Sequence, residues 1–274
     1  MINIWIWKGY WKIARRMIEG HGDDRYRYGR KIIHNFSSNV YYKGSPPQLL
    51  AKLTTHTSAI GGYPSPAARE LSHAASKKYN LPSDHFLFTN GATEAFYLIA
   101  HLFAERKAAI ASPTFSEYED ACKIHGLAYH LVDKEGFAAS DYGLVFICNP
   151  NNPDGDVTSA EKLVALIKGA PSTTFVIDEA YIEFTNRTQS LTTFIAQLPN
   201  LIIARSLTKT FAIPGIRLGY VMASPTIIEQ LLNKKMPWSV NALAIEAGLH
   251  LFENYDRWLF DVEELLEETG EFVE

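Results

Sequence analysis

The sequence predicts an α/β fold in which a mostly parallel sheet with one antiparallel strand is flanked by helices. Short runs of β-branched and aromatic residues alternate with stretches of helical periodicity through most of the 274 residues. Helices that cross over between strands make those strands parallel. The last two runs are separated by only about ten residues around Pro214-Gly215, too few for a crossover helix, so the last strand is expected to be antiparallel.

The expected strands are short and mostly apolar. In chain order they are FLF (86–88), AAIAS (108–112), LAYHLV (127–132), GLVFICN (143–149), TFVID (174–178), LIIARS (201–206) and RLGYVMA (217–223). Two helix starts are readable between them: Ser65 with Pro66 precedes AARELSHAASKKYN, and Thr158 with Glu161 forms a capping box before KLVALIKG. The segment 241–274 keeps an apolar helical period without a closing cap, which predicts one long helix.

Composition favours a globular protein that acts on small molecules or pairs with copies of itself. Of its residues 47% are hydrophobic and 20% charged, the net charge is −4, and basic runs do not exceed doublets such as Arg15-Arg16, so neither nucleic acid nor a membrane surface is an expected partner. Cys122 and Cys148 lack metal-ligand spacing, so no metal is expected and the thiols suit a reducing compartment. The N-terminus is apolar before it is basic, the reverse of a secretory signal, and no apolar run reaches membrane-spanning length, so we expect a cytoplasmic protein.

The segment SLTKTFAIPGIRLGY (206–220) carries the strongest chemical signal. The expected hairpin brings Arg217 back beside the loop that holds Ser206 and Lys209. Two cations so close repel unless an anion lies between them or the lysine is neutral, and a lysine that forms a Schiff base needs a pKa lowered to roughly 7–8. A phosphorylated aldehyde satisfies both cations. A lone Lys/Arg pair is usually a surface feature, so the hypothesis depends on other segments.

Two further segments fit such a ligand. NGATE (90–94) follows a strand and opens a helix, so the free amides of Ala92 and Thr93 are expected where a helix N-terminus holds a phosphate. Asp178 ends a buried strand at the edge where α/β folds bind ligands, and its carboxylate can hold a pyridine nitrogen protonated. Taken singly, the first is a common helix start and the second a common loop acid.

Three more side chains can contact a flat ring. Asn152 of NNPDG and Tyr181 of DEAYIEF can donate to a phenolate oxygen, and Phe115 of SPTFSEY can stack on the ring face. Each also has an ordinary interpretation as a turn residue or a core aromatic. All of these segments follow strands, so a parallel sheet brings them to one edge, and their agreement predicts a site.

These segments, in this order, resemble those of the fold type I pyridoxal 5′-phosphate (PLP) enzymes in the class I/II aminotransferase family. The resemblance covers residues from about 20 to 274. Within the family, GHGDD, FSSNV, GGYPSPAARELSHAASKKYNLP and KKMPWSVNALA (234–244) are most similar to L-threonine-O-3-phosphate decarboxylases. The resemblance implies PLP as the cofactor, a phosphorylated amino acid as the substrate, and a homodimer.

The resemblance also implies roles for individual residues. Lys209 would link covalently to PLP, Asp178 would pair with the pyridine nitrogen, and Tyr181 would donate to the ring oxygen O3′, which makes these three the expected catalytic residues. The other expected cofactor residues are Asn152 at O3′, Ala92, Thr93, Ser206 and Arg217 at the phosphate, Phe115 on the ring face, and Tyr63 at the phosphate of the neighbouring subunit. His21 and Asn39 would meet the substrate phosphate and carboxylate.

The resemblance divides the chain into three parts. Residues 1–45 correspond to an N-terminal arm and part of a small domain, 46–240 to a PLP-binding large domain, and 241–274 to a helix that leads into a small C-terminal domain. We expect the chain to stop before that domain, which in the family carries the arginine for the substrate carboxylate. Asp154 in NNPDG stands where the family usually has threonine.

The leading functional hypothesis is PLP-dependent decarboxylation of L-threonine O-3-phosphate to (R)-1-aminopropan-2-ol phosphate in cobalamin biosynthesis. A PLP-dependent aminotransferase, for instance one acting on histidinol phosphate, is the enzymatic alternative, because both reactions use the same cofactor motifs. An inactive PLP-binding remnant is the third, because part of the substrate site would be missing. Only MPWSVNALA (236–244) and HGDD (21–24) favour decarboxylation.

Overall fold

The computed structural model describes residues 35–273 of the chain. The chain divides into two units, Met1–Asn39 and Val40–Glu274. In the first unit, the described stretch 35–39 contains a local turn, in which the Asn35 side chain accepts hydrogen bonds from the Ser37 backbone N–H at 2.9 Å and from the Ser37 hydroxyl at 2.7 Å. The architecture that follows is that of the second unit.

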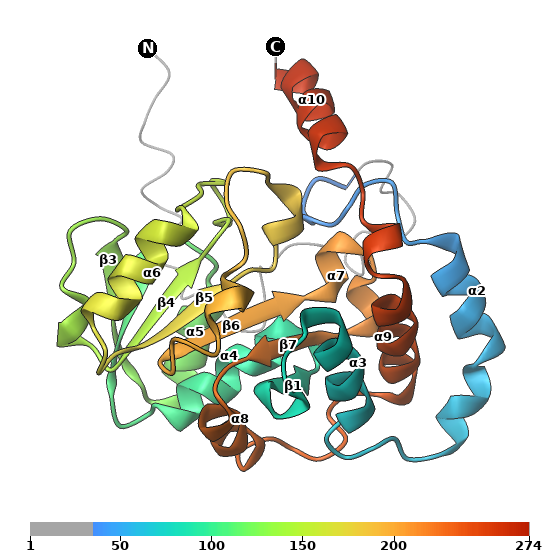
Figure 1. Cartoon of the computed structure of the whole chain (residues 1–274), viewed down its shortest axis with the longest axis horizontal. Coiled ribbons are helices and arrows are strands. Elements are labelled where there is room, and N and C mark those ends of the chain that lie inside the picture. The colour runs from blue at the N-terminus through green and yellow to red at the C-terminus, as the bar shows by residue number, and fades with distance from the viewer. Residues whose placement is uncertain (1–34, 274) are drawn as a thin grey trace, which may run out of the picture. The chain divides into compact units, whose positions relative to one another are not determined.

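One seven-stranded sheet, in the order β1-β7-β6-β5-β4-β2-β3, forms the centre of this unit (Figure 1). The strands are β1 (Phe86–Thr89), β2 (Lys107–Ser112), β3 (Ala128–Asp133), β4 (Leu144–Cys148), β5 (Thr174–Asp178), β6 (Leu201–Ser206) and β7 (Gly219–Met222). β7 runs antiparallel to both of its neighbours, β1 and β6, whereas the other strand pairs are parallel. The predicted mostly parallel sheet with one antiparallel strand is confirmed.

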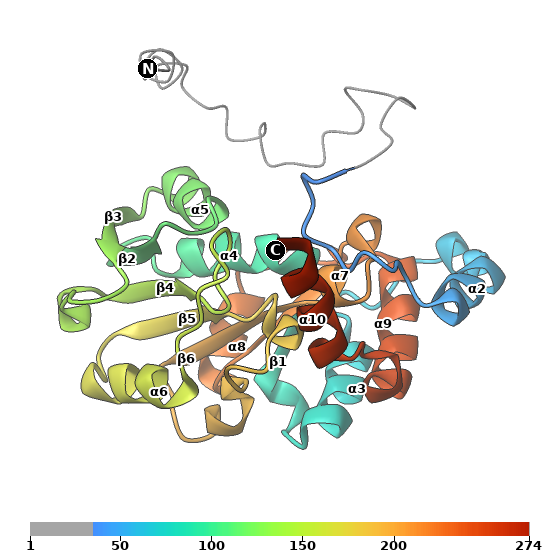
Figure 2. The ribbon, with the colours of Figure 1, turned by 90° about the horizontal axis from the view of Figure 1, so that it is seen from above.

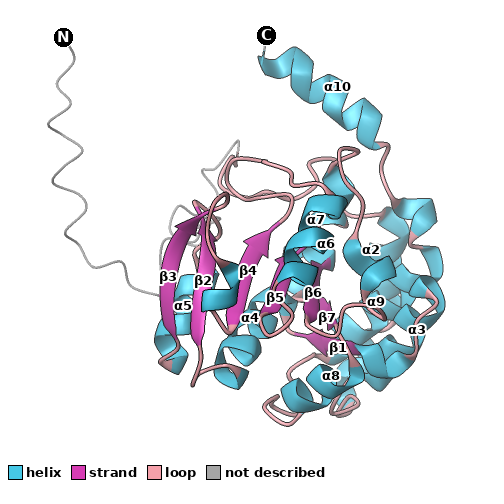
Figure 3. Ribbon diagram, turned by 60° about the vertical axis from the view of Figure 1, so that its left-hand side comes forward, coloured by secondary structure: helices cyan, strands magenta, loops and turns pink. Residues whose placement is uncertain are grey.

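Helices cover both faces of this sheet (Figures 2 and 3). They are α2 (Pro47–Thr55), α3 (Arg69–Tyr79), α4 (Gly91–Leu102), α5 (Glu117–His125), α6 (Ala160–Gly169), α7 (Leu207–Thr210), α8 (Pro225–Leu232), α9 (Ala242–Asn254) and α10 (Val262–Val273). Successive strand side chains point to opposite faces. In β5, Phe175 and Ile177 therefore join the core that includes α6 and α9, and Val176 joins the core that includes α4 and α5. Within residues 35–273, no helix has the length and apolar character needed to cross a membrane.

The C-terminal segment is not the single helix that was predicted over 241–274. α9 ends at Asn254, a 3-10 turn covers Asp256–Trp258, and Leu259 is extended with ψ 140°. α10 begins directly after Asp261. The Asp261 Oδ1 accepts from the backbone N–H groups of Glu263, at 2.9 Å, and Glu264, at 3.3 Å, in the first turn of this helix. An aspartate that caps a new helix is the local signal for this break. Figure 1 shows α10 projecting from the rest of the unit.

The start of α6 lies one residue later than predicted. Ser159 is the N-cap, and its Oγ accepts from the Lys162 N–H at 3.4 Å. Thr158 instead belongs to the preceding loop, because its N–H donates to Asn149 Oδ1 at 2.8 Å and its carbonyl accepts from Asn149 Nδ2 at 2.9 Å. The asparagine thus uses the backbone of Thr158 to close the loop after β4.

The start of α3 also differs from the prediction. The helix begins at Arg69 rather than directly after Ser65-Pro66, because Ala68 adopts a left-handed conformation with φ +49°. Ser65 still contributes as an acceptor, since its Oγ lies 3.4 Å from the Arg69 backbone N–H. Ser65 therefore accepts a hydrogen bond at the start of the helix, as expected, but the left-handed Ala68 moves the first helical turn to a later residue.

Candidate active site

A pocket with about 500 Å³ of empty space lies at the carboxyl ends of β4, β5 and β6, beside the N-terminus of α4. Its lining residues are Ala92, Thr93, Phe96, Phe115, Cys148, Asn152, Asp178, Ala180, Tyr181, Ser206, Thr208, Lys209 and Arg217. These include every residue that the sequence assigned to the ring and phosphate of the cofactor within one subunit. Segments far apart in the chain meet here because parallel strands end at the same edge.

Lys209 lies on the single turn α7, which directly follows β6. Its carbonyl accepts from the Tyr41 backbone N–H at 3.0 Å, and its Nζ lies 5.9 Å from the centroid of the Tyr181 ring. The hydroxyl oxygens of Ser206 and Thr208, one on each side of the turn's first residue, are 2.7 Å apart. Thr208 was not predicted as a site residue, although its place between Ser206 and Lys209 was a usable signal.

Arg217 reaches the N-terminus of α4 from the other side of the hairpin. Its backbone is left-handed, with φ +61°, and its Nη1 donates to the Pro214 carbonyl at 3.3 Å. The guanidinium packs against Gly91 so closely that a Cβ at position 91 would lie 2.4 Å from Nη2. Burial lowers the pKa of Arg217, although Glu117 acts in the opposite direction. A guanidinium beside helix N–H groups forms a pocket end that favours an anion.

Asp178 lies buried at the end of β5, on the floor of the pocket. Its Oδ2 accepts from Tyr118 Oη at 2.6 Å and its Oδ1 accepts from the Ala180 N–H at 3.0 Å. Burial raises the pKa of Asp178 to about 6, against the lowering effect of these hydrogen bonds and of the Lys209 charge. Tyr118 was not predicted as part of the site. It lies three residues after Phe115, on the first turn of α5, where its ring stacks on Phe146 at 5.2 Å.

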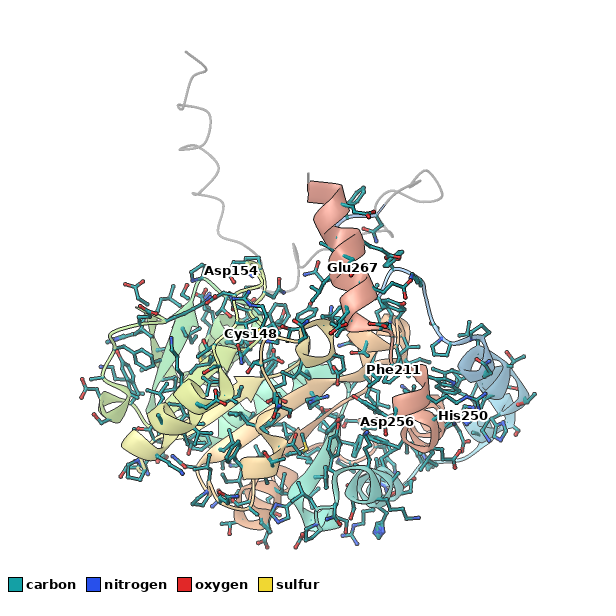
Figure 4. All side chains as sticks on the ribbon, turned by 45° about the horizontal axis from the view of Figure 1, so that its top comes forward. Cys148, Asp154, Phe211, His250, Asp256 and Glu267 are labelled. Atoms are coloured by element: carbon teal, nitrogen blue, oxygen red, sulfur yellow. The ribbon has the colours of Figure 1, made fainter. Side chains whose placement is uncertain are left out.

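The loop after β4 holds Asn152 in the pocket wall. Its neighbour Asn151 donates from Nδ2 to the Pro113 carbonyl at 2.9 Å and to Asp154 Oδ1 at 2.7 Å. Asp154, which stands where threonine was usual, also accepts from Lys134 Nζ at 3.1 Å. Burial raises the pKa of Asp154, but hydrogen bonds from Asp156, Asn151 and Lys134 outweigh it and lower the pKa to about 2. The carboxylate therefore braces the loop at its outer rim, above the buried Cys148 (Figure 4).

Three predicted residues are not brought to this pocket within the second unit. Tyr63 is 89% exposed, and its ring contacts Trp238 with 5.4 Å between centroids. Asn39 belongs to the first unit. His21 lies outside the described residues. Their proposed roles stay predictions.

The chain that forms this pocket matches a known family. The model for aminotransferase class I and II matches residues 31–268. The chain belongs to the aminotransferase class I and II family. A family match over most of the chain, together with the lysine, aspartate and arginine at one sheet edge, makes this chain a member of a family of PLP-dependent enzymes.

The similar proteins are named for two activities, threonine-phosphate decarboxylation and histidinol-phosphate transamination. A putative threonine-phosphate decarboxylase from Caldanaerobacter subterraneus subsp. tengcongensis is 33% identical over 269 residues, which cover 92% of this chain and 70% of that protein. A histidinol-phosphate aminotransferase from Symbiobacterium thermophilum is 32% identical over 226 residues, covering 78% of this chain and 63% of that protein. The chain thus spans about two thirds of the length of these relatives.

Similar solved structures include one enzyme of each of these two kinds. The L-threonine-O-3-phosphate decarboxylase from Porphyromonas gingivalis has a TM-score of 0.83 at 31% identity, over 86% of this chain and 74% of that one. The histidinol-phosphate aminotransferase from Clostridium acetobutylicum has a TM-score of 0.72 at 31% identity, over 81% of this chain and 70% of that one. Both support the fold of this class I/II aminotransferase family member.

The cofactor of this family, pyridoxal 5′-phosphate, fits the groups that line the pocket. Arg217 and the helix N-terminus suit a phosphate dianion, Lys209 suits an aldehyde, and the buried Asp178 suits a ring nitrogen that carries a proton. Gly91 has no room for a side chain beside Arg217, as expected where a ligand group must approach the backbone. Among residues 35–273, no cluster of three or more His, Cys, Asp or Glu is arranged to hold a metal ion.

Proposed function

We propose that this chain binds PLP through Lys209 and decarboxylates L-threonine O-3-phosphate to (R)-1-aminopropan-2-ol phosphate, the step that serves cobalamin biosynthesis. The observation that carries the cofactor assignment is the meeting of Lys209, Asp178 and Arg217 in one pocket. The choice of reaction is supported by the decarboxylase relative that covers 92% of the chain and by the TM-score of 0.83 to a decarboxylase structure.

Each pocket residue has a proposed role in this reaction. Lys209 holds the cofactor aldehyde and afterwards delivers a proton to the substrate carbon that lost its carboxylate. Asp178 keeps the ring nitrogen protonated, while Asn152 and Tyr181 donate to the ring oxygen. When bound, the cofactor supplies an electron sink for the bond that breaks at the substrate α-carbon.

The two ends of the cofactor are proposed to be held by different elements. Ala92 and Thr93 at the N-terminus of α4, with Ser206 and Arg217 of the hairpin, bind the phosphate. Phe115 stacks on the ring face. Residues 46–240 therefore act as the cofactor-binding part, with residues 1–45 as an N-terminal arm and 241–274 leading toward further substrate contacts. Asn39 and His21 are proposed to meet the substrate carboxylate and phosphate.

An aminotransferase that acts on histidinol phosphate is the second candidate, favoured by relatives at 32% identity. Purified chain, supplied with PLP, should be incubated with L-threonine O-3-phosphate while CO₂ and keto acid are both measured. Release of CO₂ without keto acid supports decarboxylation. A keto acid formed from L-threonine O-3-phosphate, or a phosphorylated ketone formed from histidinol phosphate, only when an amino acceptor is present supports the aminotransferase.

A PLP-binding chain without turnover is the third candidate. It is recognised by a bound PLP chromophore when neither CO₂ nor keto acid is formed.

We also propose that the protein is a homodimer and that it is located in the cytoplasm. The exposed Tyr63, which lies outside the pocket of its own subunit, supports the homodimer. The two buried thiols of Cys122 and Cys148, which form no disulfide, support the cytoplasmic location.

A further inference from the structure

A closed polar cluster lies behind the pocket, on the far face of β6. It consists of Arg205, Glu179, Glu183, Thr210 and Tyr255, and we call it the Arg205 cluster. Alternation along the strand places Arg205 on the opposite face from Ser206, which lines the pocket. Arg205 is buried, as are Glu179, Thr210 and Tyr255. The cluster is thus mostly enclosed by the core, with the Glu183 side chain 10% exposed, and none of its residues lines the pocket.

Glu183 is the acceptor at the centre of this cluster. Its carboxylate pairs with Arg205 Nη2, and Oε1 also accepts from Tyr255 Oη at 2.7 Å. Its Oε2 accepts from Thr210 Oγ1 at 3.1 Å. The second carboxylate, Glu179, pairs with Arg205 Nη1 at 3.0 Å. The Glu183 carboxylate therefore connects β6, the turn α7 and Tyr255, the residue that follows α9.

Three of the five residues in the Arg205 cluster are adjacent in sequence to residues that line the pocket. Glu179 follows Asp178, Arg205 precedes Ser206, and Thr210 follows Lys209. α7 is only four residues long, Leu207–Thr210, and one helical turn is not stable by itself in water. The orientation of Lys209 therefore depends on tertiary contacts of this turn, and the bond between Thr210 and Glu183 is a side-chain contact that anchors it.

The charge of the Glu183 carboxylate explains why it holds the surrounding segments together. The cluster holds two carboxylates and one guanidinium, and burial raises the pKa of Glu179 while Arg205 lowers it. A buried carboxylate needs a full set of donors, because an unsatisfied one is costly. Glu183 obtains its donors from three segments, so satisfying it fixes those segments relative to one another.

We propose that Glu183 is a positioning residue for Lys209: through Thr210 it ties the α7 turn to β6 and to Tyr255 at the end of α9, so that the lysine is held in place for covalent capture of the cofactor. The proposal rests on the proposed role of Lys209. It does not require Glu183 to touch the cofactor or the substrate.

The test compares two buried threonines. Thr210→Val removes the bond to Glu183 but keeps the ion pair with Arg205. Thr173→Val is the matched control, because Thr173 is 1% exposed, against 2% for Thr210, and its Oγ1 donates to two backbone carbonyls at 3.0 and 2.7 Å, before β5 and away from the pocket. The readouts are the rate at which cofactor-free protein forms its visible PLP absorbance band, and the pH at which that band changes.

We expect Thr210→Val to slow PLP capture about tenfold or more, the loss expected for one hydrogen bond to a buried carboxylate. We also expect it to move the pH midpoint of the band, whereas Thr173→Val should leave both readouts within about twofold of the unmodified protein. Thr210→Ser keeps the hydroxyl and should restore rapid capture. Equal behaviour of Thr210→Val and Thr173→Val would overturn the proposal.

A second variant keeps the test decisive if Thr210→Val fails to fold. Glu183→Asp retains the charge for Arg205 but shortens the reach toward Thr210, and it should slow capture as Thr210→Val does. Unchanged capture by Glu183→Asp would count against the positioning role. If the unmodified protein captures PLP at a lysine other than Lys209, the proposed function and this inference both fail, whereas normal labelling of Lys209 with unchanged variants refutes only the inference.

Discussion

Tyr118 and Asp178 form a buried hydrogen-bonded pair, with 2.6 Å between the phenol oxygen and Oδ2. The two residues come from α5 and β5, and Asp178 lines the pocket. Burial raises the pKa of Asp178 from the ordinary 3.8 to about 6, and the bond from Tyr118 limits that rise. The charge on this carboxylate is therefore sensitive to pH near neutrality in the cofactor-free protein.

The raised pKa predicts a pH-dependent stability. A carboxyl group whose pKa is higher in the folded protein than in the unfolded chain stabilises the fold as the pH falls toward and below its folded pKa. Between pH 7 and pH 5, Asp178 should add about 1 kcal/mol to the free energy of unfolding of the cofactor-free protein. Urea unfolding at both pH values measures this, and Asp178→Asn should remove that increment. An equal pH response in both proteins would contradict the assignment.

Lys209 is expected to be the lysine that captures PLP. Reduction of the PLP-loaded protein with borohydride, followed by peptide mapping, should place the pyridoxyl group on Lys209, and Lys209→Ala should abolish the label. Lys235 is the informative comparison, because it is buried and burial lowers its pKa, although Glu94 opposes that effect. A label on Lys235 in the unmodified protein would refute the site assignment.

Gly91→Ala should weaken PLP binding by displacing Arg217. The new Cβ would lie 2.4 Å from Nη2, so the guanidinium must move away from the proposed phosphate position. We expect the dissociation constant for PLP to rise about tenfold, as for the loss of one charged hydrogen bond. Spectroscopic titration with PLP gives this constant.

The matched control for that experiment is Gly136→Ala. Gly136 has a similar left-handed backbone, with φ +86° against +74° for Gly91, but nothing lies within 4 Å of its added Cβ. Both variants should lose about 1 kcal/mol of stability through backbone strain, while only Gly91→Ala should bind PLP more weakly. Equal PLP affinities in the two variants would show that Arg217 does not hold the phosphate.

Tyr63 is expected to act across a dimer interface. Mixed dimers of Tyr63→Phe and Lys209→Ala chains contain one site with an intact lysine and an intact tyrosine from the partner. Such mixtures should regain PLP affinity that the Tyr63→Phe homodimer lacks, and this affinity is measured by titration before and after mixing. A monomer in ultracentrifugation that binds PLP as tightly as any dimer would disprove this arrangement.

Local sequence signals were enough for the strands and for most of the pocket. Asp178 and Ser206 end apolar runs, and Ala92 and Asn152 follow such runs closely, so the rule that parallel strands end at a common edge was sufficient to group them. The antiparallel position of β7 followed from the short connection around Pro214 alone. These features depend on residues close together in sequence.

Other features depend on contacts between distant segments. Tyr118 lies in an ordinary amphipathic helix, and only its meeting with Asp178, 60 residues later, makes it part of the site. The break at Leu259 was hidden because its apolar neighbours continue the helical period on both sides. Glu183 reads as a surface turn acid until Arg205 and Tyr255 are placed around it.

Gly219 sets a limit on how this chain can vary in length. It pairs with Thr89 of β1 on one side and Ser206 of β6 on the other, and a Cβ there would lie 2.5 Å from the Ala92 nitrogen. An insertion between Ser206 and Gly219 would therefore shift Arg217 relative to both Lys209 and α4. The connection from β3 to β4 contributes no side chain to the pocket. In related or engineered chains, additions should be tolerated in that connection and selected against in the hairpin.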